Sequence, residues 1–152
     1  MAQRLGALLA AILLTYCLAV AVGTVVLMNG IAEFGIAVSF IDRLAAVGHD
    51  LLGMAPSYLP LISIAMAIAL PLATQIVRRF VVPRVPVYLL AGFAAMIALH
   101  KLMEWSLGLI GFASARTLAG LMGQALAGAL GGAVYAWAHR SDRHASVSAA
   151  TA

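Results

Sequence analysis

Long runs of apolar residues, separated by short polar connections, dominate the chain. Four such segments lie at residues 6–28, 58–77, 87–110 and 114–137. At a helical rise of about 1.5 Å per residue, each reaches about 30 Å or more, the thickness of the hydrocarbon core of a bilayer. A segment in lipid must satisfy its backbone polar groups internally, so each is expected to be a helix. The pattern therefore predicts an all-α integral membrane protein with a bundle of four transmembrane helices.

The stretch between the first two segments is also patterned, over residues 34–54. One set of positions with helical spacing is apolar: Phe34, Val38, Ile41, Leu44, Ala45, Leu51 and Leu52. The other side is mostly polar: Ser39, Asp42, Arg43, Ala46, His49 and Asp50. This spacing is typical of an amphipathic helix. We expect it on the extracytoplasmic side, flat on the membrane surface or folded over the mouth of the bundle.

The composition agrees with a membrane protein. Hydrophobic residues make up 64% of the 152 residues and charged residues 9%, against about 45–50% and about 25% in soluble domains. The single cysteine, Cys17, excludes an intramolecular disulfide and a Cys-based zinc site, and is interpreted as a buried small hydrophobic residue. The nine Lys and Arg residues are scattered between apolar segments and form no basic stripe, so nucleic acid is not an expected partner.

The arginines predict the orientation. One side of a four-helix threading carries most of them: Arg4, Arg78, Arg79, Arg84, Arg140 and Arg143. The opposite side carries only Arg43 and Arg116. Since short cytoplasmic loops are rich in Lys and Arg, this predicts a bacterial-type inner membrane protein with both termini cytoplasmic.

Aromatic residues are expected near the two membrane interfaces, where amphipathic rings prefer to lie. Tyr88, Tyr135 and Trp137 fall near the inner interface, and Tyr58 and Trp105 near the outer one.

Prolines mark the second segment: Pro60 in its first turn, where a missing N–H costs little, and Pro71 inside it, where a kink is expected.

The ends of the chain need separate interpretations. Arg4 followed by an apolar run and Ala19-Val20-Ala21 resembles a signal peptide, but the run continues to Met28, which favours a retained helix. Residues 1–140 are expected to form one helical membrane domain. Residues 141–152 consist mainly of Ser, Ala and Thr, and are expected to be a disordered cytoplasmic tail.

The fourth segment carries small residues at regular spacing. Gly120, Gln124, Gly128, Gly132 and Ala136 recur every four residues, with Gly123 and Gly131 beside them. Small residues let two helices approach closely in a membrane, where van der Waals contact drives association. The glycines Gly120, Gly123, Gly128, Gly131 and Gly132 therefore predict close helix packing. Packing inside the bundle is favoured, and a homo-oligomer or a membrane-protein partner is the alternative.

The third segment holds the ionisable residues His100, Lys101 and Glu104, which share one sector of a helix. Counted by helical rise, Gln124 of the fourth segment is level with His100, and Arg116 lies nearer the outer end. We expect a hydrogen bond from His100 to Gln124, and Glu104 paired with Lys101 or Arg116. Because intramembrane charges are costly, this candidate polar site is either a structural device that keeps two helices in register or a proton or substrate site.

The function is open between three classes. No HExxH, P-loop, GxSxG or GxGxxG motif in a strand-helix context is present, so no catalytic residues, enzyme activity or metal site are expected. The favoured interpretation is a non-catalytic structural, accessory or assembly subunit. The alternative is a small oligomeric transporter or channel with a polar site at His100, Glu104 and Gln124. A haem held by His49 and His100 is a third and weaker hypothesis, so no cofactor is expected.

Overall fold

The computed structural model describes residues 2–80, 82–107 and 117–138, and these residues form an all-helical protein. The helices are α1 (Ala2–Glu33), α2 (Phe40–Gly53), α3 (Ala55–Arg79), α4 (Arg84–Leu107) and α5 (Leu118–Ala138). Four of them, α1, α3, α4 and α5, are long and apolar enough to cross a membrane. The predicted all-α class and the four long apolar helices are thus confirmed. Arg116, Arg140, Arg143 and the expected tail at 141–152 lie outside the described residues.

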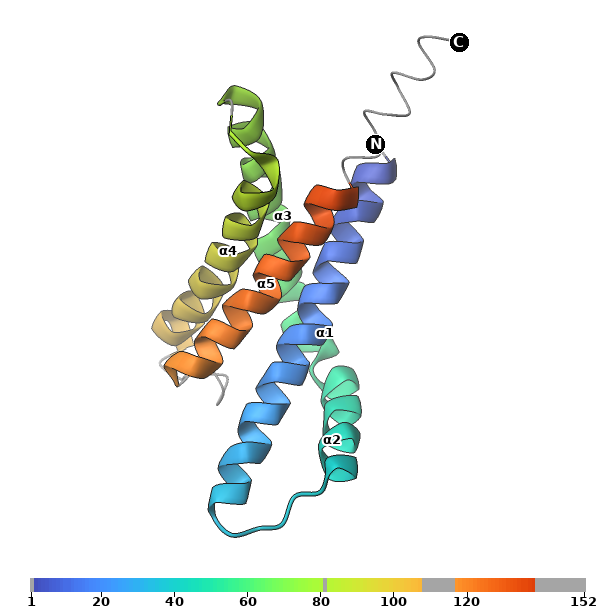
Figure 1. Ribbon diagram of the computed structural model, residues 1–152, viewed down its shortest axis with the longest axis vertical. Helices are drawn as coiled ribbons and strands as arrows, with labels where there is room; N and C mark the ends of the chain where they lie inside the picture. The colour runs from blue at the N-terminus through green and yellow to red at the C-terminus, as the bar shows by residue number, and fades with distance from the viewer. Residues whose placement is uncertain (1, 81, 108–116, 139–152) are drawn as a thin grey trace.

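The four long helices pack side by side, with α5 between α1 and α4 and with α3 behind them (Figure 1). The most extensive contacts are those of α5 with α4 and with α1. Apolar side chains fill the centre, among them Ala11, Val20, Ile62, Met66, Leu70 and Met96. Many leucines face outward and are more than half exposed: Leu5, Leu9, Leu13, Leu72, Leu90 and Leu130. This distribution suits apolar surroundings, since soluble proteins rarely expose so much apolar surface.

Glycines allow α5 and α4 to touch through their backbones. A Cβ atom at Gly128 would overlap the carbonyl oxygen of Gly92, and one at Gly132 would overlap the carbonyl oxygen of Tyr88. Gly92, which the sequence analysis did not single out, is thus part of the same contact. The expected close packing along the fourth apolar segment is present, and its neighbour on this side is α4 of the same chain.

A second side of α5 meets α1. A Cβ atom at Gly131 would overlap the hydroxyl oxygen of Thr15, and one at Gly123 would lie 2.7 Å from Cγ1 of Val22. Gly120 is buried as well. The glycine-rich surface of α5 is therefore occupied by α4 and α1 rather than left open for another chain.

The helix α2 begins at Phe40, six residues later than the predicted start at Phe34. Gly35 adopts a positive φ of 81°, in the turn that follows α1. Ser39 then forms a capping box: its hydroxyl accepts from the backbone N–H of Asp42 at 3.1 Å, and the Asp42 carboxylate accepts from the backbone N–H of Ser39 at 2.9 Å. The Ser39 hydroxyl also donates to the Asp42 carboxylate at 2.7 Å, and this bond, together with the one from the backbone N–H of Ser39, holds the pKa of Asp42 below its ordinary value. The earlier boundary was wrong because this capping box sets the first turn.

Polar contacts attach α2 to the last turns of α1. Arg43 donates to the side-chain oxygen of Asn29 at 2.6 Å, and Thr24 donates to the carboxylate of Asp50 at 2.7 Å. Figure 1 shows α2 lying beside this part of α1. With 32 residues, α1 is about 48 Å long, more than the hydrocarbon core of a bilayer. The side of α2 that carries Arg43 and Asp50 thus lies against α1, and the apolar residues Phe40, Ile41, Leu44 and Leu52 are exposed.

Several other expectations need correction. Cys17 is exposed rather than buried. Tyr58, Tyr88 and Tyr135 are buried in the bundle rather than placed around it as an aromatic belt, whereas Trp105 and Trp137 are largely exposed. The difference arises because each tyrosine hydroxyl can be buried when it finds a partner, as Tyr88 does by donating to Thr74 at 3.0 Å.

One proline of α3, Pro60, is placed differently from the prediction, whereas Pro71 lies inside the helix as predicted. Because α3 begins at Ala55, Pro56 occupies its first turn, and Pro60 and Pro71 both lie inside the helix. A proline in a helix interior cannot donate a backbone hydrogen bond.

Candidate polar site

The hydroxyl of Tyr58 is the centre of a buried polar cluster. Tyr58 belongs to α3, and its side chain is 1% exposed. Its hydroxyl donates to Oε1 of Gln124 in α5 at 3.1 Å and lies 3.3 Å from Nε2 of His100 in α4. Both of these partners are buried too. Three helices therefore meet at one oxygen atom.

The cluster extends to α1 through the other end of the glutamine. Nε2 of Gln124 donates to the backbone carbonyl of Ala19 at 2.9 Å. We call Tyr58, His100, Gln124 and the Ala19 carbonyl the polar core. Each of the four long helices contributes one member, so the polar core joins all of them at one level of the bundle.

The sequence predicted a hydrogen bond between His100 and Gln124, and the structure connects these residues through the Tyr58 hydroxyl. The depth argument placed them level with each other, and the structure places both on the Tyr58 hydroxyl. The sequence analysis had assigned Tyr58 to a membrane interface and so missed its role. A signal was available, because Tyr58 opens α3 at the same end of the bundle from which the depth of His100 was counted. The Ala19 carbonyl gave no signal, since any residue has one.

The hydrogen atoms of the polar core can be counted. Nδ1 of His100 lies 2.8 Å from the carbonyl oxygen of Met96, so this nitrogen must carry a hydrogen. In a neutral ring Nε2 then carries none. The Tyr58 hydroxyl has one hydrogen, and Gln124 presents an oxygen to it because its NH₂ group is committed to Ala19. The hydroxyl can donate to Nε2 or to Oε1, but not to both.

With a neutral His100, the Tyr58 hydroxyl donates either to the ring or to Gln124. With a doubly protonated ring, Nε2 would donate to Tyr58, and Tyr58 would donate to Gln124. The same heavy-atom positions thus offer hydrogen-bond partners to both forms of the ring, although the protonated form places a charge in a buried cluster.

The rest of the predicted site does not join the polar core. Lys101 and Glu104 form an ion pair at 2.8 Å on the outer side of α4, with side chains 62% and 46% exposed. Glu104 is thus paired with Lys101, one of its two expected partners, but neither residue lies with His100 in the polar core. Burying a charge is expensive, and two charged residues three positions apart can pair with each other outside the core. Arg116, the alternative partner of Glu104, lies outside the described residues.

A further contact connects the polar core with α2. The rings of Tyr16 and Tyr58 lie 6.3 Å apart, and the Tyr16 hydroxyl donates to the backbone carbonyl of Leu51 in α2. The ring of Tyr58 also meets His100 edge to face, with centroids 6.1 Å apart. The position of α2 is thus linked to the polar core through two tyrosines.

The two histidines considered for haem have different surroundings. The side chain of His49 in α2 is 86% exposed and lies 3.5 Å from the Asp50 carboxylate. His100 is buried against Tyr58 and Met96. Among the described residues, no group of three or more His, Cys, Asp or Glu side chains is arranged to hold a metal ion.

Comparison of the chain with protein-family models, with curated proteins and with solved structures gives no match. The functional argument therefore rests on the residues of this chain alone.

Proposed function

We propose that the chain is an integral membrane protein without catalytic activity, which serves as a structural, accessory or assembly subunit. Insertion is supported by the four long apolar helices and by the outward-facing leucines. Arg4, Arg78, Arg79 and Arg84 lie at one end of the bundle, the end at which α1 begins and α3 turns into α4 (Figure 1). By the positive-inside rule we assign this end to the cytoplasmic side of a bacterial-type inner membrane.

One observation carries the structural role: the polar core bonds the four long helices to one another. In lipid there is no hydrophobic drive between helices, so interhelical hydrogen bonds and close packing must hold a bundle together. Tyr58, His100 and Gln124 supply such bonds at one level, and Gly128 and Gly132 supply backbone contact along α5. The buried polar residues thus have a complete use in the architecture without any reaction.

The helix α2 is assigned to the outer membrane surface. Its exposed apolar residues are Phe40, Ile41, Leu44 and Leu52. Its polar contacts with Asn29 and Thr24 keep it beside the end of α1 that extends beyond the other long helices (Figure 1). In water these apolar side chains would be a liability, and the acyl boundary of the membrane or a partner subunit would cover them.

In this proposal a partner membrane protein contacts the outer surface of the bundle. The glycines of α5 are occupied by α4 and α1, so the close contact expected there is already made within the chain. Exposed leucines of α1 and α5, such as Leu9, Leu13 and Leu130, remain for a neighbouring membrane protein.

A small oligomeric transporter or channel is the second candidate, and the geometry of the polar core favours it. A buried histidine hydrogen-bonded to a tyrosine inside a membrane helix bundle is suited to bind and release a proton. A pathway through this site would use His100 and Gln124, whereas Glu104 is paired with Lys101 on the outer side of α4. Proton movement would then have to pass Tyr58.

Two measurements on the same variants separate the candidates. His100→Ala breaks the polar core, and Lys101→Ala, at an exposed position, is the control. For an accessory subunit, His100→Ala lowers the stability of the bundle in detergent, Lys101→Ala does not, and the wild type in liposomes gives background flux across a panel of ions and metabolites. A pH-dependent flux that His100→Ala abolishes while the helices stay folded would contradict the accessory role and establish the transporter.

A further inference from the structure

A groove runs along the outside of the bundle between α3 and α4. Its volume is about 850 Å³. Apolar side chains line it on both sides, among them Ile68, Leu72 and Ile76 of α3 and Val87, Ala91 and Ala95 of α4. The two helices touch less extensively than α4 and α5 do, and alanines on α4 leave the space unfilled.

Two arginines follow the lining residues of the groove along α3 and α4, at the end where these helices are joined. Arg79 follows Leu72 by seven residues, which at 100° per residue places it about 20° from Leu72 around α3. Arg84 precedes Ala91 by seven residues and is placed in the same way about 20° from Ala91 around α4. Both helices therefore present a guanidinium group one turn beyond the last apolar lining residues, Ile76 and Val87.

Arg78 does not share this position. It is one residue from Arg79 and thus about 100° away around α3, outside the sector of the lining residues. It is exposed like Arg79 and carries the same charge. The chain therefore contains a matched control for the role of Arg79.

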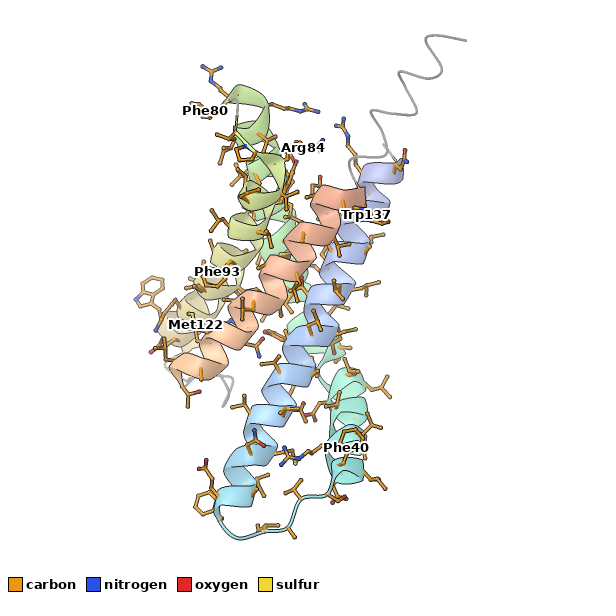
Figure 2. All side chains as sticks on the ribbon, in the orientation of Figure 1. Phe40, Phe80, Arg84, Phe93, Met122 and Trp137 are labelled. Atoms are coloured by element: carbon orange, nitrogen blue, oxygen red, sulfur yellow. The ribbon has the colours of Figure 1, made fainter. Side chains whose placement is uncertain are left out.

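The charge at the two ends of the groove differs. In the described part of the chain, the acidic residues Glu33, Asp42, Asp50 and Glu104 belong to the end of α1, to α2 and to the end of α4, away from the turn between α3 and α4. At the opposite end of the groove, which Leu102 lines, the positive charge of Lys101 is compensated by Glu104. Figure 2 shows Phe80 and Arg84 at the turn end, where the arginines gather. Only this end is complementary to an anion.

We propose that the groove binds an anionic phospholipid, with one acyl chain between α3 and α4 and the phosphate between Arg79 and Arg84. The apolar lining matches the chain, and the guanidinium groups match the phosphate, to which arginine donates bidentate hydrogen bonds. Basic positions between membrane helices are known to hold lipid headgroups in this manner. The inference rests on the membrane insertion proposed above, but not on the accessory role.

The test uses the full chain in bilayer nanodiscs of phosphatidylcholine containing a minor fraction of phosphatidylglycerol. Native mass spectrometry then counts the lipids retained after release. We expect phosphatidylglycerol to be retained in preference to phosphatidylcholine. The binding free energy that one arginine near the membrane surface contributes corresponds to roughly a fivefold change in affinity for an anionic lipid. The double variant Arg79→Ala, Arg84→Ala should therefore weaken phosphatidylglycerol retention roughly 30-fold. Arg78→Ala should leave retention close to the wild type.

A variant of the groove itself tests the acyl chain. Ala94 lines the groove and is exposed, so Ala94→Phe fills space without entering the core, and it should reduce phosphatidylglycerol retention with both arginines intact. Glycerol phosphate, which has the headgroup charge but no chain, should not compete. Three results would overturn the proposal. Arg78→Ala could lose as much phosphatidylglycerol as the variant without Arg79 and Arg84, or the wild type could retain phosphatidylcholine as well as phosphatidylglycerol. The third is full retention of phosphatidylglycerol in Ala94→Phe. Membrane fractionation gives the separate control: a chain absent from the membrane refutes the insertion, whereas an inserted chain without lipid preference refutes only this site.

Discussion

The hydroxyl of Tyr58 lies 3.1 Å from Oε1 of Gln124, although the two residues are 66 positions apart in the chain. This bond connects α3 with α5, two helices on different sides of the bundle centre. It also determines what His100 can do, because the same hydroxyl is 3.3 Å from its Nε2 atom. One oxygen atom thus contacts both the amide of another helix and a buried imidazole ring.

The coupling between Tyr58 and Gln124 is measurable in a double-mutant cycle. Tyr58→Phe removes the hydroxyl and keeps the ring, and Gln124→Leu removes both bonds of the amide. Each variant leaves a buried polar group without its bond, so each should lower the free energy of unfolding by about 1–3 kcal/mol. Because the residues share a bond, the double variant should lose less than the sum, by about 1 kcal/mol. Unfolding in mixed detergent gives these values, with Trp105→Phe at an exposed position as the control. Strict additivity would show that the bond contributes nothing.

The contact between α5 and α4 predicts a strong difference between two glycines. Gly128→Ala places a Cβ atom on the carbonyl oxygen of Gly92, which belongs to a helix backbone and can move only with α4. We expect a loss of about 1–3 kcal/mol in stability. Gly30→Ala in α1 meets nothing within 4 Å and should be neutral or stabilising by up to about 1 kcal/mol. Thermal unfolding of the two variants checks this, and equal stability would mean that α5 and α4 do not touch at Gly128.

The hydrogen count of the polar core predicts which nitrogen of His100 carries a hydrogen. Nδ1 faces the Met96 carbonyl and should be protonated at every pH at which the bundle is folded. Nε2 should gain its hydrogen only when the ring takes up a proton, and Tyr58→Phe should change the signal of Nε2 more than that of Nδ1. Nitrogen-15 NMR of the labelled histidine reports both atoms. A neutral ring with its hydrogen on Nε2 would contradict the geometry.

The capping box of α2 predicts a local response to acid. The bonds from Ser39 lower the pKa of Asp42 in the folded state, so the contribution of the carboxylate to α2 is complete above the unfolded value of about 3.9. It is lost as the pH falls through the lower, folded value. The protection of the amides at the start of α2, measured as the exchange rate relative to that of an unstructured peptide at the same pH, should therefore fall at acid pH, and Ser39→Ala should move this loss of protection to higher pH. Protection that does not change with pH at this helix start would show that the capping box is not formed.

The helices could be predicted from the sequence because long apolar runs leave few alternatives in lipid. The level of His100 with Gln124 followed from helical rise alone. Which other residues join His100 and Gln124 could not be predicted, because that depends on which face each helix turns toward the centre of the bundle. Tyr58 could equally have faced a membrane interface, and Glu104 lies only about 40° from His100 around α4 yet is exposed. The start of α2 could not be predicted because it depends on the capping box between Ser39 and Asp42, which begins the helix at Phe40.

Native mass spectrometry of the protein, extracted in mild detergent from its own membranes at native expression, distinguishes an accessory subunit from a self-contained carrier. We expect a defined complex with a different membrane protein, together with a set of bound lipids. Isolation of the chain solely as a monomer or as an oligomer of identical copies would contradict it, and an oligomer would direct attention to proton movement through His100.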